Sequence, residues 1–139
     1  MKSIFAIVLL FWTQAAHAQT VFDAVRGEYG SAADPATSCA INPHQLDFIA
    51  NPPHAVLTWQ KPKNDGVGQH RSFERYDIED HDSGTMTLRE EGDFRPDRAG
   101  GPIWEFQITR IPPGYCWRRP DWPQVQCVDQ QLRCENVTS

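Results

Sequence analysis

Apolar and polar residues alternate with a period of two through much of this chain, and this pattern predicts β-strands. Residues 45–49 and 55–59 alternate on the two sides of Asn51-Pro52-Pro53, which predicts two strands joined by a turn. Residues 73–79 and 85–89 also alternate, and the Asp, Ser and Gly residues between them favour a tight connection. We therefore expect a β-hairpin at the centre of the chain.

The strongest strand pattern lies at 103–109, where Trp, Phe and Ile share one face and Glu, Gln and Thr share the other. Pro and Gly residues at 112–114 predict a turn after this strand. We expect the segments 115–118 and 125–128 to pair with each other, and 132–134 to form a last short strand. The whole chain then contains roughly seven or eight strands.

Helix signals are scarce, because the 11 Pro residues are spread along the chain and Pro interrupts helix interiors. The segment 21–26 is compatible with a helical turn or with a first strand. The polar segments 61–68 and 91–102 predict loops. Many short strands between Gly and Pro residues predict an all-β single domain, either a small antiparallel barrel or a sandwich.

The first residues carry the three parts of an export signal, which are Lys2, an apolar run at 4–12 and Ala16-His17-Ala18. We expect cleavage after Ala18, so that 1–18 is a signal peptide and 19–139 is one β-rich domain. The apolar run is shorter than the roughly 20 residues of a membrane-spanning helix, and no later run approaches that length. We therefore expect a periplasmic or secreted protein without a membrane span.

Cysteine usage also indicates an oxidising compartment. The four cysteines are Cys39, Cys116, Cys127 and Cys134, and an even number in an exported chain predicts disulfides. A zinc site is disfavoured because the chain has no Cys-x-x-Cys pair. Of the three possible pairings we favour Cys116–Cys127, which would close a loop, with Cys39–Cys134, which would join the start of the domain to its end.

The charge balance excludes some partners. The chain has 13 Lys and Arg against 18 Asp and Glu, a formal net charge of −5. Nucleic acids and anionic membranes demand clustered basic residues, whereas the Arg residues here are scattered or interleaved with acids. We therefore expect no nucleic-acid partner, and we expect the protein to be a monomer.

The first part of the mature chain resembles small bacterial exported proteins of the lipocalin-like β-barrel type. The likeness lies in short motifs, namely Gly27-Glu28-Tyr29-Gly30, Ser38-Cys39, Asn42-Pro43, Leu46 and Phe48. In those proteins an early Gly-x-aromatic segment starts the barrel, and a Cys often follows it. The resemblance implies a lipocalin-like barrel, and some members of that group inhibit secreted hydrolases while others carry small apolar ligands.

The most distinctive segment for binding is 115–123, which a disulfide between Cys116 and Cys127 would hold in place. Trp, Tyr and Arg dominate binding hot spots, and a constrained loop loses less entropy on binding. The structural alternative is that Trp117 belongs to the core beside the disulfide and that an Arg pairs with Asp121. The candidate binding residues are Tyr115, Trp117, Arg118, Arg119, Asp121 and Trp122.

No pattern for catalysis or metal binding stands out. No Ser has a Gly-x-Ser-x-Gly setting, and the adjacent Glu90 and Glu91 would point to opposite faces of a strand. The acidic turn at 79–82 lacks the ligand spacing of a helix-loop-helix calcium site. The four His residues of the mature chain are too far apart in sequence to form a local pair. We expect neither an enzyme nor a metal or other cofactor.

Two functions follow from these observations. The first is a periplasmic binding or inhibitory protein that recognises a protein partner in the cell envelope through the Trp/Arg loop. The alternative is a carrier of a small apolar ligand inside the barrel. The expected interior lining is Trp59, Met86, Leu88, Trp104 and Phe106.

Overall fold

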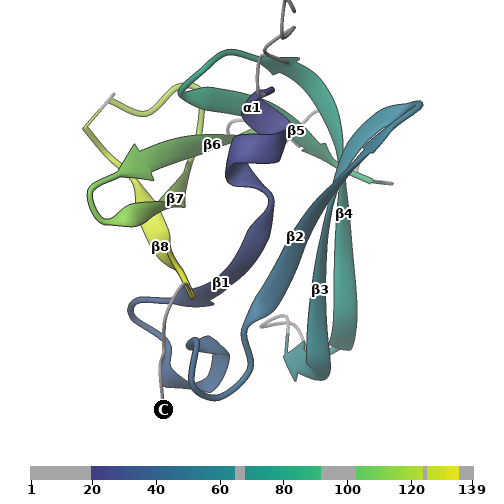
Figure 1. The fold of residues 1–139 in the computed structure, drawn as a ribbon, viewed down its shortest axis with the longest axis vertical. Helices are drawn as coiled ribbons and strands as arrows, with labels where there is room; N and C mark the ends of the chain where they lie inside the picture. Colours follow the sequence, from purple (N-terminus) through teal and green to yellow (C-terminus); the bar gives the residue numbers. More distant parts are fainter. Residues whose placement is uncertain (1–19, 65–67, 92–102, 124, 135–139) are drawn as a thin grey trace, which may run out of the picture.

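The strands form a closed antiparallel barrel, so the barrel alternative of the predicted all-β fold is confirmed (Figure 1). The structure is a computed structural model, and it describes residues 20–64, 68–91, 103–123 and 125–134. The expected signal peptide at 1–18 lies outside the described residues, as does the expected loop at 91–102 except for Glu91.

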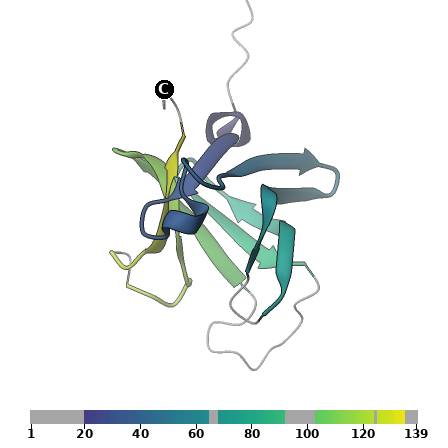
Figure 2. The same cartoon turned by 90° about the horizontal axis from the view of Figure 1, so that it is seen from below.

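Each of the eight strands pairs with the next in sequence, and β8 pairs with β1 to close the barrel (Figure 1 and Figure 2). A closed barrel has no exposed sheet edge that could pair with another chain. The elements in chain order are α1 (Val21–Val25), β1 (Gly27–Ser31), η1 (Pro35–Thr37), β2 (His44–Ala50), β3 (Pro53–Asn64), β4 (His70–His81), β5 (Thr85–Glu90), β6 (Ile103–Arg110), β7 (Pro113–Arg118) and β8 (Val128–Arg133).

The alternating segments at 45–59, 73–89 and 103–109 are strands as expected, while two polar regions differ from the expectation. The expected loop at 61–68 is wrong at its start, because β3 continues to Asn64 and pairs with β4 beyond a β-bulge. The expected strand at 125–128 is also wrong: only Val128 belongs to a strand, and β8 runs on without a break. Polar strands give little alternation of apolar and polar residues, and this explains why the sequence does not predict the end of β3 or the centre of β8.

Apolar side chains from α1 and from β1 to β7 point into the barrel and fill its centre. The buried apolar core consists of Val25, Tyr29, Leu46, Ala55, Leu57, Trp59, Tyr76, Met86, Leu88, Phe106 and Tyr115. Leu46, Met86, Leu88, Phe106 and Tyr115 have no exposed surface at all. Because these large side chains meet in the middle, space for a ligand is found at the ends of the barrel.

The helix α1 lies over the barrel end at which β1 begins (Figure 1). Thr20 caps its first turn, since the Thr20 hydroxyl accepts a hydrogen bond from the Asp23 amide and the Asp23 carboxylate accepts one from the Thr20 amide. At its other end, Arg133 donates to the Ala24 carbonyl at 2.8 Å, and the Tyr29 hydroxyl donates to the Val25 carbonyl at 2.5 Å. These contacts place the ambiguous segment 21–26 as a helix that is attached to β1 and β8.

Both favoured disulfides are present. Cys39–Cys134 joins the segment after β1 to the end of β8, and Cys116–Cys127 joins β7 to the start of β8. The first bond requires the chain around Cys39 to pass directly over Gly30, where a Cβ atom would lie 2.1 Å from the Cys39 nitrogen. Only glycine fits at this crossing.

Candidate functional site

The first half of the candidate binding loop lies inside the barrel. Tyr115 is completely buried, and its ring centroid lies 4.1 Å from that of Phe106. Trp117 also packs on Phe106, at 4.3 Å between ring centroids, and is half-buried. These two aromatic residues therefore form part of the core.

The two arginines of the loop contact groups of the protein itself. Arg118 and Arg119 are each only 8% exposed. Arg118 donates to the Trp122 carbonyl at 2.6 Å, and its Nε lies 3.4 Å from a carboxylate oxygen of Glu105. The side chain of Arg118 thus ties the far end of the loop to β6.

Arg119 holds the loop from the other side. It donates to the Ile103 carbonyl at 2.9 Å, and its guanidinium lies 3.5 Å from the ring centroid of Trp104. Trp104 in turn makes an edge contact with Trp122. The surface that this rigid loop offers to a partner therefore consists mainly of Asp121, part of Trp122 and their exposed proline neighbours.

A layer of aromatic side chains divides the barrel interior into two ends. The Tyr29 ring lies 5.0 Å from the Tyr115 ring, and the Tyr115 hydroxyl lies 2.5 Å from His44 Nε2. Burial, together with the nearby charge of Lys63, lowers the pKa of His44 to about 3, so its ring is neutral at physiological pH. Burial also raises the pKa of Tyr115 well above its usual range.

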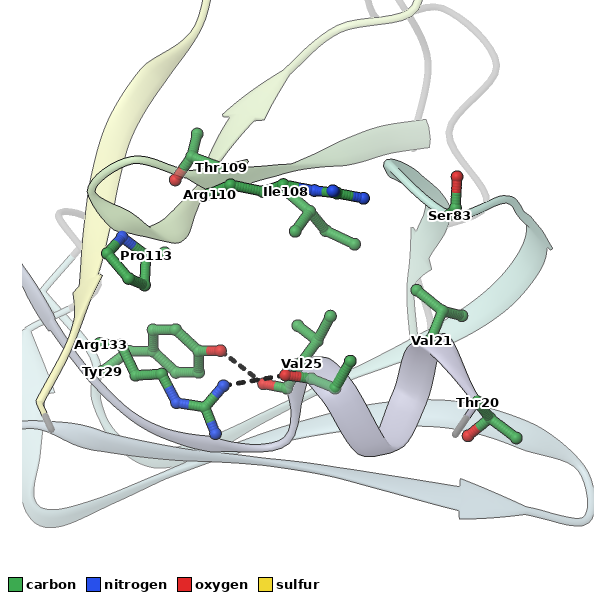
Figure 3. Close-up of a pocket in the computed structure, with 12 residues that line it drawn as sticks. Thr20, Val21, Val25, Tyr29, Ser83, Ile108, Thr109, Arg110, Pro113 and Arg133 are labelled. Carbon is green, nitrogen blue, oxygen red and sulfur yellow. Dashed lines mark hydrogen bonds between the residues drawn. The ribbon is translucent and has the colours of Figure 1, made fainter. Parts of the chain in front are cut away.

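A pocket at one end of the barrel, here called the α1 pocket, lies between α1 and the β6–β7 turn and has a volume of about 450 Å³. Figure 3 shows Val25 and Ile108 pointing into it from opposite sides, with Val21 and Pro113 beside them. Tyr29 forms its inner wall (Figure 3). Most of the surface that a ligand would meet here is therefore apolar.

Two arginines line the α1 pocket, and none of the Asp or Glu residues that the structure describes is part of its lining. Arg133 is engaged by the helix, because it donates to the Ala24 and Arg26 carbonyls. Arg110 is exposed, and its side chain forms no ion pair or hydrogen bond with any residue in the described part of the chain. The pocket thus combines apolar walls with one cation that is available to a ligand.

Sequence reasoning did not single out the residues of the α1 pocket. They come from the start of the domain, from the β6–β7 turn and from the last strand, so no local motif contains them. The one local signal is Arg110-Ile111-Pro112, where a basic residue precedes an Ile that is 96% exposed.

A second and smaller pocket, here called the mouth pocket, opens at the other end of the barrel and has a volume of about 220 Å³. Its walls are more polar than those of the α1 pocket. Lys63 and Glu74 form an ion pair of 2.9 Å there, and the Lys63 ammonium lies 4.1 Å from the ring centroid of Trp59. His44, Tyr115 and Trp117 form part of its lining.

Side chains of the acidic turn at 79–82 make contacts within their own hairpin. Asp82 accepts hydrogen bonds from the Gly84 and Thr85 amides, which lower the pKa of Asp82, and Glu79 pairs with Arg89 at 2.7 Å. Among the residues that the structure describes, no three His, Cys, Asp or Glu side chains lie close enough together to hold a metal ion.

Comparison with known proteins gives no relative: no family model, no curated protein and no solved structure matches this chain. Within the described ranges, no helix is long and apolar enough to cross a membrane. The function is therefore argued from the pockets and surfaces themselves.

Proposed function

We propose that this protein is an exported binding protein whose α1 pocket takes a small anionic amphiphile, that is, a short apolar chain or ring with a carboxylate or similar head group. The observation that carries this proposal is the wall of the pocket, which is mostly apolar and which, among the described residues, has arginines but no acid in a chain of net charge −5. The export signal expected from the sequence and the two disulfides support a place outside the reducing cytoplasm.

The walls of the pocket determine what it binds. Each methylene that leaves water contributes about 0.8 kcal/mol, so Val21, Val25 and Ile108 favour an apolar tail. Arg110 offers a charge-assisted hydrogen bond to the head group, and this distinguishes an anion from a neutral molecule of the same shape. The pocket volume of about 450 Å³ lies within the range of small-molecule sites and suits a tail of medium length.

Octanoate and octan-1-ol test the proposal, because they have the same tail and differ in charge. In an NMR titration of the mature protein, octanoate should shift the amide signals of Val25 and Ile108 and should bind more tightly than octan-1-ol. Arg110→Gln should weaken octanoate binding by about tenfold and leave octan-1-ol binding unchanged. Lys61→Gln removes the same charge from β3 outside the pocket and should change neither affinity.

The proposal fails if octanoate shifts none of the signals that line the α1 pocket. It also fails if Arg110→Gln and Lys61→Gln weaken octanoate binding equally. The effect of Arg110 would then come only from the net charge of the protein.

Recognition of a partner in the cell envelope is a second candidate function, and the anchored loop favours it. Arg118 and Arg119 hold the loop in one conformation, so little entropy is lost when a partner binds. Val125, which follows the loop, is 95% exposed, although apolar side chains usually avoid water. Asp121, Trp122 and Val125 lie close together in sequence and expose both polar and apolar groups.

A loop variant and a matched surface variant test this candidate. Val125→Ser with Trp122→Ala should abolish capture of a specific envelope protein by the immobilised mature protein. Ile111→Ser alters an equally exposed Ile at the opposite end of the barrel and should leave that capture unchanged. If the two variants capture the envelope protein equally well, or if neither captures it, the loop surface does not recognise that protein.

A further inference from the structure

We propose that the mouth pocket is a second ligand site, and that it takes a neutral polyhydroxylated molecule about the size of one sugar ring. This inference does not depend on the α1 pocket. The mouth pocket lies where β1, β3 and β7 end and where β2, β4 and β8 begin, which is the end of the barrel opposite α1. Its volume of about 220 Å³ limits the ligand to a small molecule.

One buried donor in the wall of this pocket lacks a partner, and a histidine beside it has one ring nitrogen that makes no hydrogen bond to the described residues. Trp59 is 5% exposed, and its indole N–H has no hydrogen-bond partner among the described residues. The ring of His44 is 2% exposed, and its only hydrogen bond within the described part of the chain is the one between Nε2 and Tyr115. A buried donor or acceptor without a partner is costly, so such groups are usually satisfied by water or by a ligand.

Hydroxyl groups suit both of these side chains. The indole N–H of Trp59 is only a donor, whereas the free nitrogen of the neutral His44 ring donates or accepts according to its tautomer. A hydroxyl group both donates and accepts, so one molecule with several hydroxyls can serve both residues. The rings of Trp59 and Trp117 in the same wall offer apolar surface to the C–H groups of such a molecule.

The charges of the mouth pocket disfavour an anion. Lys63, the one basic side chain that the described residues contribute to its lining, is held between Glu74 and the Trp59 ring. Asp34 is used in capping η1, where its carboxylate accepts from the Ala36 amide. Asp129 adds a further negative charge at the rim. The net charge of the described lining residues is therefore opposite in sign to that of the α1 pocket. This charge favours a neutral ligand over a carboxylate of similar shape.

Glucose, galactose, N-acetylglucosamine and the anion glucuronate are suitable probes in NMR titrations of the full mature protein. At least one neutral sugar at up to tens of millimolar should shift the Trp59 indole signal in a saturable way, together with the Gln131 amide. Glucuronate should bind at least about tenfold more weakly than glucose. Octanoate should not move these signals, so failure at one pocket is distinguished from failure at the other.

Two variants separate recognition from folding. Trp59→Phe keeps an aromatic ring but removes the N–H, and it should weaken sugar binding, measured at the Gln131 amide, by about tenfold. Trp122→Phe lies outside the pocket and should have no effect. Asp129→Asn at the exposed rim should keep the fold, because Asn suits the positive φ of 50° there, and should improve the relative affinity for glucuronate.

Two results would overturn this inference. One is the absence of any shift at Trp59 and Gln131 with all three neutral sugars. The other is binding that neither Trp59→Phe nor Asp129→Asn alters, because the sugar would then lie elsewhere on the protein.

Discussion

Lowering the pH from 7.5 to 5 should destabilise this protein through one histidine. His44 lies in the aromatic layer at the centre of the barrel, 2% exposed, with its Nε2 2.5 Å from the Tyr115 hydroxyl. Its pKa is lowered from 6.5 to about 3, chiefly because burial disfavours the charged ring. In the unfolded chain the same ring titrates at its ordinary value.

The sign and size of the effect follow from proton linkage. Below pH 6.5 the unfolded state binds a proton at His44, whereas the folded state does not. The free energy of unfolding therefore falls as the pH decreases from 6.5 toward 3. At pH 5 the difference spans 1.5 pH units, and at about 1.4 kcal/mol per unit it amounts to a loss of about 2 kcal/mol. Asp23 and Asp82 have pKa values lowered from 3.8, so their contributions change only at more acidic pH.

Urea denaturation at pH 7.5 and pH 5 measures this loss. The wild-type free energy of unfolding should decrease by about 2 kcal/mol more than that of His44→Gln, which has no proton to gain at this position. His70→Gln removes an exposed histidine on β4 and should keep the wild-type decrease. An equal decrease in wild type and His44→Gln would refute the reasoning, because His44 would then titrate alike in both states.

Further predictions concern the disulfides and the anchored loop. Replacing both cysteines of the 39–134 bond by Ser should lower the free energy of unfolding by about 4–5 kcal/mol, against about 3 kcal/mol for the 116–127 bond, because the longer loop gains more entropy in the unfolded chain. Equal losses in urea denaturation would contradict this order. Arg119→Ala should cost about 1–3 kcal/mol through its lost carbonyl and Trp104 contacts, whereas exposed Asp121→Ala should change stability by less than about 0.5 kcal/mol. Similar thermal shifts for both variants would show that Arg119 does not anchor the loop.

The strands could be predicted from the sequence where one face is apolar and the other polar. The run from Ile103 to Thr109 and the hairpin around residues 80–84 alternate clearly, because each strand has one side in the core. The sequence does not distinguish a closed barrel from a sandwich, since closure depends on pairing between β1 and β8, about a hundred residues apart. No local pattern specifies such a contact.

The candidate loop shows what composition alone cannot predict. Two Trp and two Arg within a few residues are typical of a binding surface, but Arg118 and Arg119 find internal partners in Glu105 and Ile103 on β6. Those partners are distant in sequence, so the burial of the two arginines follows only from the fold. The α1 pocket was missed for the same reason, because the chain brings it together from both ends of the domain.

The central claim is that the α1 pocket holds the tail of an anionic amphiphile with the head group at Arg110. Intermolecular NOEs between octanoate and the mature protein test it most directly. We expect NOEs from the octanoate methylenes to the methyl groups of Val25 and Ile108, with the carboxylate end nearest the side chain of Arg110. NOEs confined to other surfaces, or a tail that contacts the mouth pocket instead, would contradict the account.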